Sequence, residues 1–400
     1  MIEKYYSGVI EQIYNRIGKE TRNIVMANYS NDFSIENLEV IRRYQSNEDN
    51  VFFAYSEFSY NTLVGAYEPF LDIICNMHRR FIGGSFDEFQ KECGVYYLHR
   101  QVLNSYYETG ECFREETVLL NEVAYEQRRM TMAIADMLKK LSEVKPLMIV
   151  INRFQMASKS SIETIKYLID NPCANIGIVL GVNAIVKGTD STVEVWDRIV
   201  ESLEDRSAIY YIGSAGPLKN NVKTTNDDEL YITMNFEQSI QEASNIMEFL
   251  DFEQARRGCR IIEHKLKFED AWIDEKSLRR FYMVYARTSV LLGEMSKAIE
   301  LTNESKALIP ENDSEHYLSL YYFMKGTCYM YQGKLEKAGN SAKSAYDYAV
   351  LAEDDTLIFK AELLSVMIKM SGWYNIFFCV QDIPVSDEII EKLIKHGYRN

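Results

Sequence analysis

The sequence contains no long run of hydrophobic residues. Its longest apolar stretches, such as 146–151 and 176–182, are far shorter than the roughly 20 residues that a helix needs to span a bilayer. The N-terminus begins Met-Ile-Glu-Lys and lacks the apolar core and small-residue cleavage site of an export signal. We therefore expect a cytoplasmic protein that does not enter a membrane.

Basic residues are too few to balance the acidic ones. The chain has 44 lysines and arginines against 59 aspartates and glutamates, which gives a net charge of −15. Nucleic-acid binding depends on a basic footprint, and attraction to an anionic membrane surface does too. The charge balance therefore disfavours both nucleic acid and membrane as partners.

Metal-binding and catalytic motifs are also missing. The seven cysteines are scattered and include no Cys-x-x-Cys pair, as is typical of reduced thiols in the cytoplasm. The spacing of Cys93, His99 and Cys112 matches no zinc pattern, so buried thiols are the preferred interpretation. No motif surrounds any of the five histidines, and no nucleophile–base pair is recognisable. We expect no metal, no cofactor and no enzymatic activity.

The first half of the sequence alternates short apolar runs with helical patterns. Runs of this length that are apolar on both sides are typical of parallel strands covered by helices on both faces. They lie at 23–26, 51–55, 146–151, 176–182 and 208–212. Helical spacing of apolar residues occurs near 2–17, 35–43, 66–82, 114–143, 159–170 and 193–203. This alternation predicts an α/β domain with a parallel sheet.

The character of the chain changes after Ile212. Residues 214–235 form a polar linker, and from 236 onward one helical pattern follows another. Gly293 and Gly333 lie 40 residues apart, and each is followed by an alanine five residues later. A glycine where two helices turn and a small residue where they touch are typical of stacked helical hairpins. We therefore predict an α/β domain over 1–213, a linker over 214–235 and all-α helical repeats over 236–400.

The predicted first strand leads into a segment with the length of a phosphate-binding loop. In such loops a strand is followed by Gly-x-x-x-x-Gly-Lys-Ser/Thr and then by a helix. Ala27 occupies the first glycine position here, and Ser30 lies inside the loop. Asp32, Phe33 and Ser34 occupy the second glycine, the lysine and the serine. Because the glycines and the positive charge that cradle phosphate are gone, we expect poor affinity for phosphate.

A later segment, 146–158, resembles the Walker B region of STAND ATPases, the signal-transduction relatives of AAA+ proteins. It keeps their apolar strand, their turn and a following helix that includes Ser-Ser-Ile-Glu. Asn152 and Arg153 stand where that family has its Mg²⁺-binding aspartate and its catalytic acid, and Asn183 stands where it has an arginine. The resemblance covers about 1–213 and implies a degenerate P-loop domain, a pseudo-ATPase. An unrelated α/β domain is the alternative.

The helical half resembles tetratricopeptide (TPR) repeats over 279–310 and 319–348. Such repeats hold a partner segment on the inner face of each first helix, so the resemblance implies a protein-binding groove. The groove residues would be Arg280, Met283, Arg287, Phe323, Met330 and Tyr331. The two arginines, two helical turns apart, could bind carboxylates of a peptide. Ion pairs with Glu275 or Glu294 are the alternative, and the one we prefer.

These patterns together predict a signalling or regulatory scaffold: an α/β parallel-sheet P-loop-like domain without catalysis, joined to a TPR-like solenoid that binds a protein or peptide. The alternative is a nucleotide-sensing switch that binds nucleotide without hydrolysing it. The apolar character of 371–379 is unlike a polar capping helix, which favours a longer parent protein with further repeats or an output domain.

Overall fold

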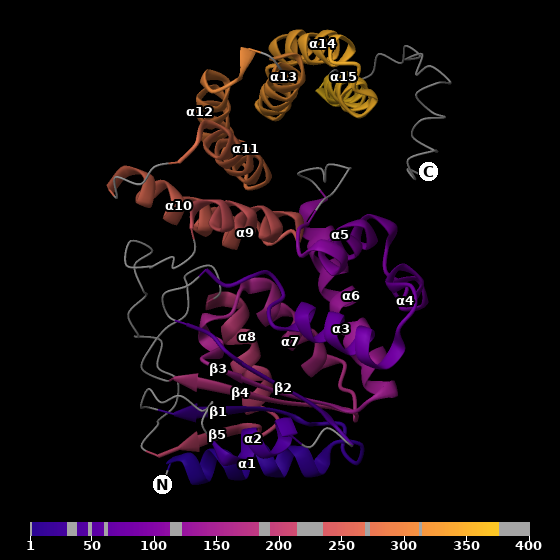
Figure 1. The fold of residues 1–400 in the computed structure, drawn as a ribbon, viewed down its shortest axis with the longest axis vertical. Helices are drawn as coiled ribbons and strands as arrows, with labels where there is room; N and C mark the ends of the chain where they lie inside the picture. Colours follow the sequence, from indigo (N-terminus) through magenta and orange to yellow (C-terminus); the bar gives the residue numbers. More distant parts are fainter. Residues whose placement is uncertain are drawn as a thin grey trace. The chain divides into compact units, whose positions relative to one another are not determined.

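The structure is a computed structural model that describes residues 2–29, 38–46, 50–59, 63–112, 122–183, 193–213, 235–268, 273–311 and 314–375. The chain forms two compact units, Met1–Ala271 and Trp272–Asn400. Figure 1 shows the sheet and its helices in the first unit and helices alone in the second. No helix in the described ranges is long and apolar enough to cross a membrane.

A five-stranded parallel sheet forms the centre of the first unit. Its strands are β1 (Ile24–Tyr29), β2 (Phe52–Glu57), β3 (Leu147–Asn152), β4 (Ile176–Asn183) and β5 (Ile209–Ile212), in the order β2-β3-β4-β1-β5. Each strand overlaps one of the predicted apolar runs, so the prediction of a parallel α/β sheet is confirmed. β3 and β4 are buried along their whole length, which explains why their sequences are apolar on both sides.

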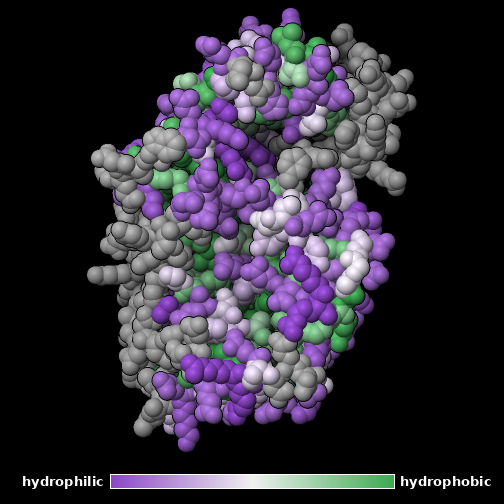
Figure 2. Space-filling view, in the orientation of Figure 1, coloured by the Kyte–Doolittle hydropathy of each residue, from purple (hydrophilic) through white to green (hydrophobic). Residues whose placement is uncertain are grey.

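Helices cover both faces of the sheet (Figure 1). One face carries α1 (Ile2–Arg16) and α2 (Glu39–Ser46). The other carries α3 (Phe70–Met77), α6 (Val123–Val144), α7 (Lys159–Asp170) and α8 (Val193–Glu204). Between α3 and α6 lie a π-helical turn (His78–Ile82), α4 (Phe86–Glu92) and α5 (Tyr97–Thr109). On the face that Figure 2 shows, hydrophilic residues cover most of the described surface, as expected when the apolar positions face inward.

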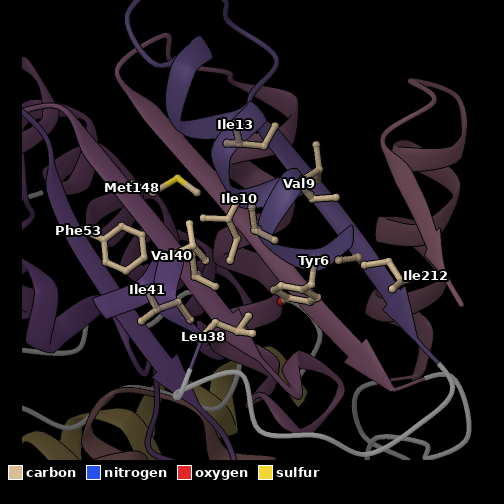
Figure 3. Close-up of a cluster of buried hydrophobic side chains, with 14 of the residues drawn as sticks. Tyr6, Val9, Ile10, Ile13, Leu38, Val40, Ile41, Phe53, Met148 and Ile212 are labelled. Carbon is tan, nitrogen blue, oxygen red and sulfur yellow. The ribbon is translucent and has the colours of Figure 1, made fainter. Parts of the chain in front are cut away.

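The face beneath α1 and α2 holds a core of apolar side chains. Figure 3 shows Ile10 and Ile13 of α1, Val40 and Ile41 of α2 and Met148 of β3 gathered in it. All of these are at least 96% buried. The helical spacing of apolar residues over 2–17 therefore predicted the packed face of α1 correctly.

The first unit also includes α9 (Phe236–Glu248) and α10 (Phe252–Phe268). The backbone N–H of Cys112 donates to Asn245 Oδ1 over 2.9 Å, and Gln254 Nε2 donates to the carbonyl of Val64 over 2.9 Å. The sequence predicts that the helical repeats begin at residue 236, which would include α9 and α10. The structure places both helices in the first unit, because helical periodicity does not indicate which neighbour a helix packs against. The division between the two units lies near residue 271.

The second unit is built from helical hairpins. Its helices are α11 (Glu275–Leu291), α12 (Met295–Ala307), α13 (Ser314–Tyr331), α14 (Leu335–Leu351) and α15 (Asp355–Asn375). Gly293 and Gly333 sit at the hairpin turns with φ of +79° and +72°, a backbone region that favours glycine. Ala298 and Ala338 are fully buried. The predicted roles of these glycines and alanines are therefore confirmed.

Candidate functional site

The carboxyl ends of β1 and β4 meet where the sheet changes direction. From β1 the chain crosses β4 and β3 to reach β2, whereas from β4 it crosses β1 to reach β5. In open α/β sheets, ligands bind outside the carboxyl ends of the strands at such a switch point. Tyr29 and Asn183 end these two strands and lie opposite each other in the register. A ligand-binding site in this sheet is therefore expected at the carboxyl ends of β1 and β4.

A buried hydrogen bond links two strands across this edge. The Tyr29 hydroxyl on β1 donates to Asn152 Oδ1 on β3 over 2.6 Å, and both side chains are fully buried. β4 lies between these two strands and carries Gly181. A Cβ at Gly181 would lie 2.8 Å from Asn152 Oδ1 and would overlap the Tyr6 hydroxyl. The glycine therefore makes room for the polar cluster of Tyr6, Tyr29 and Asn152.

Tyr6 brings the third side chain of this cluster from α1. Its ring lies edge-on to that of Tyr29, with ring centroids 6.3 Å apart. Burial, followed by the nearby Tyr29, raises the pKa of Tyr6 well above its usual range, so the phenol stays neutral. Figure 3 places Tyr6 in the same apolar core as Leu38 and Ile212. The cluster is thus polar but uncharged, which suits a buried position.

Arg153 turns back toward β2 immediately after Asn152. Its backbone has φ +54°, in the left-handed region. The guanidinium forms an ion pair with Glu57 Oε1 at 3.1 Å and donates to the carbonyl of Phe58 over 3.4 Å. Arg153 thus neutralises the acidic residue that ends β2.

Gln155 is a further candidate residue at this edge, and the sequence did not predict it. It lies on the short 3₁₀ turn Phe154–Met156 after β3 and is 3% exposed. Its Oε1 accepts from the backbone N–H of Asn183 over 3.3 Å, whereas its Nε2 has no hydrogen-bond partner among the described residues. A polar residue three positions after a buried strand was the only sequence signal. Among the residues that the structure describes, Gln155 Nε2 is thus a donor without a partner at this edge.

Most of the predicted phosphate loop, namely Ser30, Asp32, Phe33 and Ser34, lies outside the described residues. Ala27 is described, and it lies within β1, fully buried and opposite Gly181. The strand is longer than the sequence suggested because Ala27 and Tyr29 both face the core under α1. The predicted site residues Asn152 and Asn183 do lie at strand ends on the same edge.

The predicted groove residues of the second unit differ in exposure. Arg280 is exposed, and Met283 and Arg287 on the same helix are half-buried. Met330 is only 6% exposed and packs in a core cluster, so it is not available to a partner. The remaining groove candidates, Phe323 and Tyr331, are half-buried against that cluster.

Arg279, next to the predicted Arg280, has a structural role that the sequence analysis missed. It is 7% exposed, and its Nη1 donates to the carbonyl of Leu308 over 2.8 Å. Its guanidinium carbon lies 3.9 Å from the centre of the Tyr317 ring. Arg279 thereby links α11 to the segment after α12 and to the first turn of α13.

The three residues considered for a metal site have separate environments. His99 Nε2 lies 3.0 Å from Glu126 Oε2 in a buried pair. Burial raises the pKa of Cys93 to about 12, which keeps its thiol protonated. Cys112 is buried, whereas Cys93 is half-buried. Across the described ranges, no group of three or more His, Cys, Asp or Glu side chains is arranged to hold a metal ion.

No family model matches the sequence, and no curated protein is detectably similar to it.

Proposed function

We propose that the chain is a non-catalytic regulatory scaffold, in which a pseudo-ATPase unit of the STAND type is joined to helical repeats that bind a protein partner. The observation that carries the proposal is the hydrogen bond from Tyr29 to Asn152. In the family that the sequence resembles, the position of Asn152 holds the aspartate that binds Mg²⁺. Here a neutral amide fills it, and its oxygen already accepts from a buried tyrosine.

The residues on this edge do not fit ATP with Mg²⁺. Hard cations need carboxylate, carbonyl or water oxygens in an open arrangement. Asn152 is fully buried, and Glu57 is paired with Arg153. The described edge offers no unpaired carboxylate at the end of β1, β3 or β4, so a hydrolysis mechanism would lack its metal ligand there.

The expected result is that ATP, ADP and GTP with Mg²⁺ are not hydrolysed and do not raise the melting temperature. Binding at 100 times the dissociation constant would add about 2.7 kcal/mol of stability, which a thermal shift detects readily. Asn152→Asp is the matched variant, because it restores the acid alone. Turnover that co-purifies with the wild-type protein and changes in this variant would contradict the proposal.

A second candidate function, nucleotide sensing without hydrolysis, is favoured by Gln155 alone. Its buried Nε2 is a donor without a partner among the described residues, and a ligand carbonyl or hydroxyl could accept from it. A thermal shift with any nucleotide that disappears in Gln155→Met would support this function. A shift that persists in the variant would place the nucleotide elsewhere.

The partner-binding part of the proposal rests on α11 and α13. Arg280 and Arg287 on α11 and the half-buried aromatic side chains on α13 suit a peptide with an apolar anchor and an acidic group. We expect Arg280→Glu with Arg287→Glu to weaken the binding of a partner captured with the full chain. The matched control is Lys337→Glu with Lys343→Glu, which makes the same charge change at exposed positions of α14, outside the predicted groove. Equal loss in both double variants would indicate a general charge effect instead of a groove.

A further inference from the structure

The first unit contains a cavity of about 380 Å³ beyond the carboxyl end of β2. This volume lies within the range of small-molecule pockets, roughly 300–1,000 Å³. Much of its wall is apolar or aromatic and comes from the segment after β2, from α3, from α5 and from α9. These wall residues are Phe58, Leu63, Leu71, Tyr106, Ile246 and Phe249.

Carboxylates line the same cavity, and no lysine, arginine or histidine lines it among the described residues. One carboxylate, that of Glu57, is already paired with Arg153. Glu68 accepts from the backbone N–H of Gly65 over 2.9 Å, and Asp72 accepts from the Tyr106 hydroxyl over 3.1 Å. Both of these donors are uncharged, so they leave the negative charge in place.

The carboxylates of Glu242 on α9 and Glu68 both lie next to Gly65. A Cβ built on Gly65 would lie 3.0 Å from Glu242 Oε1 and 3.3 Å from Glu68 Oε2. Two carboxylate oxygens from elements far apart in the sequence therefore converge beside a residue that has no side chain. The negative charges of Glu68 and Glu242 repel each other unless a cation or a proton lies between the two carboxylates.

We propose that this cavity binds an organic ammonium group, which sits between Glu68 and Glu242 while its hydrocarbon part packs on Phe58 and Phe249. An ammonium carries three donors, enough for both carboxylates and one further acceptor. Aromatic faces attract it further, and the apolar wall favours an amine with a hydrocarbon chain over an inorganic ion. The described carboxylates form no metal-binding group, which also favours an organic cation. This inference is independent of the function proposed above.

The protonation of Glu242 gives the binding a pH dependence. Burial, followed by Glu68 and Asp72, raises the pKa of Glu242 to about 7. The other titratable groups lining the cavity are Glu57, which Arg153 neutralises, and Tyr106. A bound ammonium stabilises the ionised form of Glu242. Affinity therefore rises with pH through about 7, and binding near that pH releases protons.

Titration calorimetry on the full chain tests the proposal, with cadaverine as the probe at pH 6 and pH 8. We expect binding that is several-fold tighter at pH 8 and an enthalpy at pH 7 that depends on the ionisation heat of the buffer. Glu242→Gln should weaken binding about tenfold or more and reduce the pH dependence, of which only the part due to Glu68, whose pKa burial also raises, would remain. Glu237→Gln, an exposed change of the same kind on the same helix, should leave binding unchanged.

A second arm identifies the source of the ammonium group. A short lysine-containing peptide with blocked ends is compared with cadaverine: tighter binding of the peptide indicates a partner's lysine, and tighter binding of cadaverine indicates a free amine. Glu68→Gln provides a second variant if Glu242→Gln fails to fold. Absence of binding by both probes at pH 8 would overturn the proposal. Binding that survives both carboxylate variants would overturn it too.

Discussion

At the scale of single residues, the carboxyl edge of the sheet shows how buried polar side chains can be satisfied without a charged group. A buried aspartate would need a cation or several donors, because an unpaired charge in the interior is very costly. Asn152 and Tyr29 satisfy each other as neutral groups, and Gly181 gives them the space. The polar cluster therefore stabilises the edge without a ligand.

Tyr29→Phe tests this role. The substitution removes the donor to Asn152 Oδ1 inside a fully buried region, so we expect the free energy of unfolding to fall by about 1–2 kcal/mol. Chemical denaturation of the full chain measures the change. Tyr5→Phe on α1, where the tyrosine is 62% exposed, is the control and should change stability by less than about 0.5 kcal/mol. Equal effects at the two positions would argue against a stabilising hydrogen bond.

Glu242 gives a prediction about pH. Its pKa is about 7 in the folded protein, against 4.5 for an unperturbed glutamate, so the native state binds more protons between these two values. The stability of the wild type should therefore decline as pH rises from about 4.5 to 7. Glu242→Gln should be more stable than the wild type by about 1–2 kcal/mol at pH 8, because the half-buried carboxylate keeps part of its hydration.

Melting temperatures of the two proteins across this pH range test the prediction. The difference between them should vanish near pH 4.5, where Glu242 is protonated in the folded protein. A difference that stays constant with pH would mean that the substitution acts through packing and not through ionisation.

At the scale of secondary structure, periodicity predicted the elements whose packing is simple. The five strands and the α11–α14 hairpins follow from apolar runs and from glycines at turns. α4 and α5 were missed because no apolar stripe separates them clearly from the loops around them. The place of Tyr6 in the polar cluster and the position of Gln155 were not predicted for another reason: both depend on strands far away in the sequence, which no local pattern reveals.

Two glycines inside helices of the second unit allow a matched test. A Cβ at Gly326 of α13 would lie 2.9 Å from Leu364 Cδ2 and 3.3 Å from Ser341 Cβ, whereas a Cβ at Gly339 of α14 would meet nothing within 4 Å. Gly339→Ala should therefore raise stability by about 0.5–1 kcal/mol, the usual gain for alanine in a helix. Gly326→Ala should lower it by about 1–2 kcal/mol, because overpacking outweighs that gain.

Chemical denaturation of both variants checks these opposite signs. Gly333→Ala is a useful third variant: the position has φ +72° and open space, so any loss of stability there comes from backbone strain alone. A stabilised Gly326→Ala would mean that α13 and α15 are not in close contact.

At the scale of the whole chain, the boundary between the units is what the sequence placed least well. The polar composition of 214–235 predicts a linker between domains. The two helices that follow it, α9 and α10, nevertheless belong to the α/β unit. Phe249 lies edge-on to Tyr67, with ring centroids 6.1 Å apart, and the backbone N–H of Ser160 donates to Asp251 Oδ2 over 3.0 Å. Contacts between such distant segments become visible only when the chain is folded.

The last prediction follows from these contacts. A fragment of residues 1–271 should unfold in one cooperative transition, whereas a fragment of residues 1–213 should be strongly destabilised and prone to aggregate. The shorter fragment loses the cover provided by Ile246, Phe249 and Phe252, each at least 99% buried, and each such side chain is worth about 1.5–3 kcal/mol. It also leaves the N–H groups of Cys112 and Ser160 without their acceptors, which adds about 1–3 kcal/mol for each. Together these losses rival the roughly 5–15 kcal/mol of net stability typical of a domain.

Circular dichroism melting and size-exclusion chromatography compare the two fragments. A 1–213 fragment that melts as cooperatively and at the same temperature as 1–271 would show that α9 and α10 are not part of the first unit.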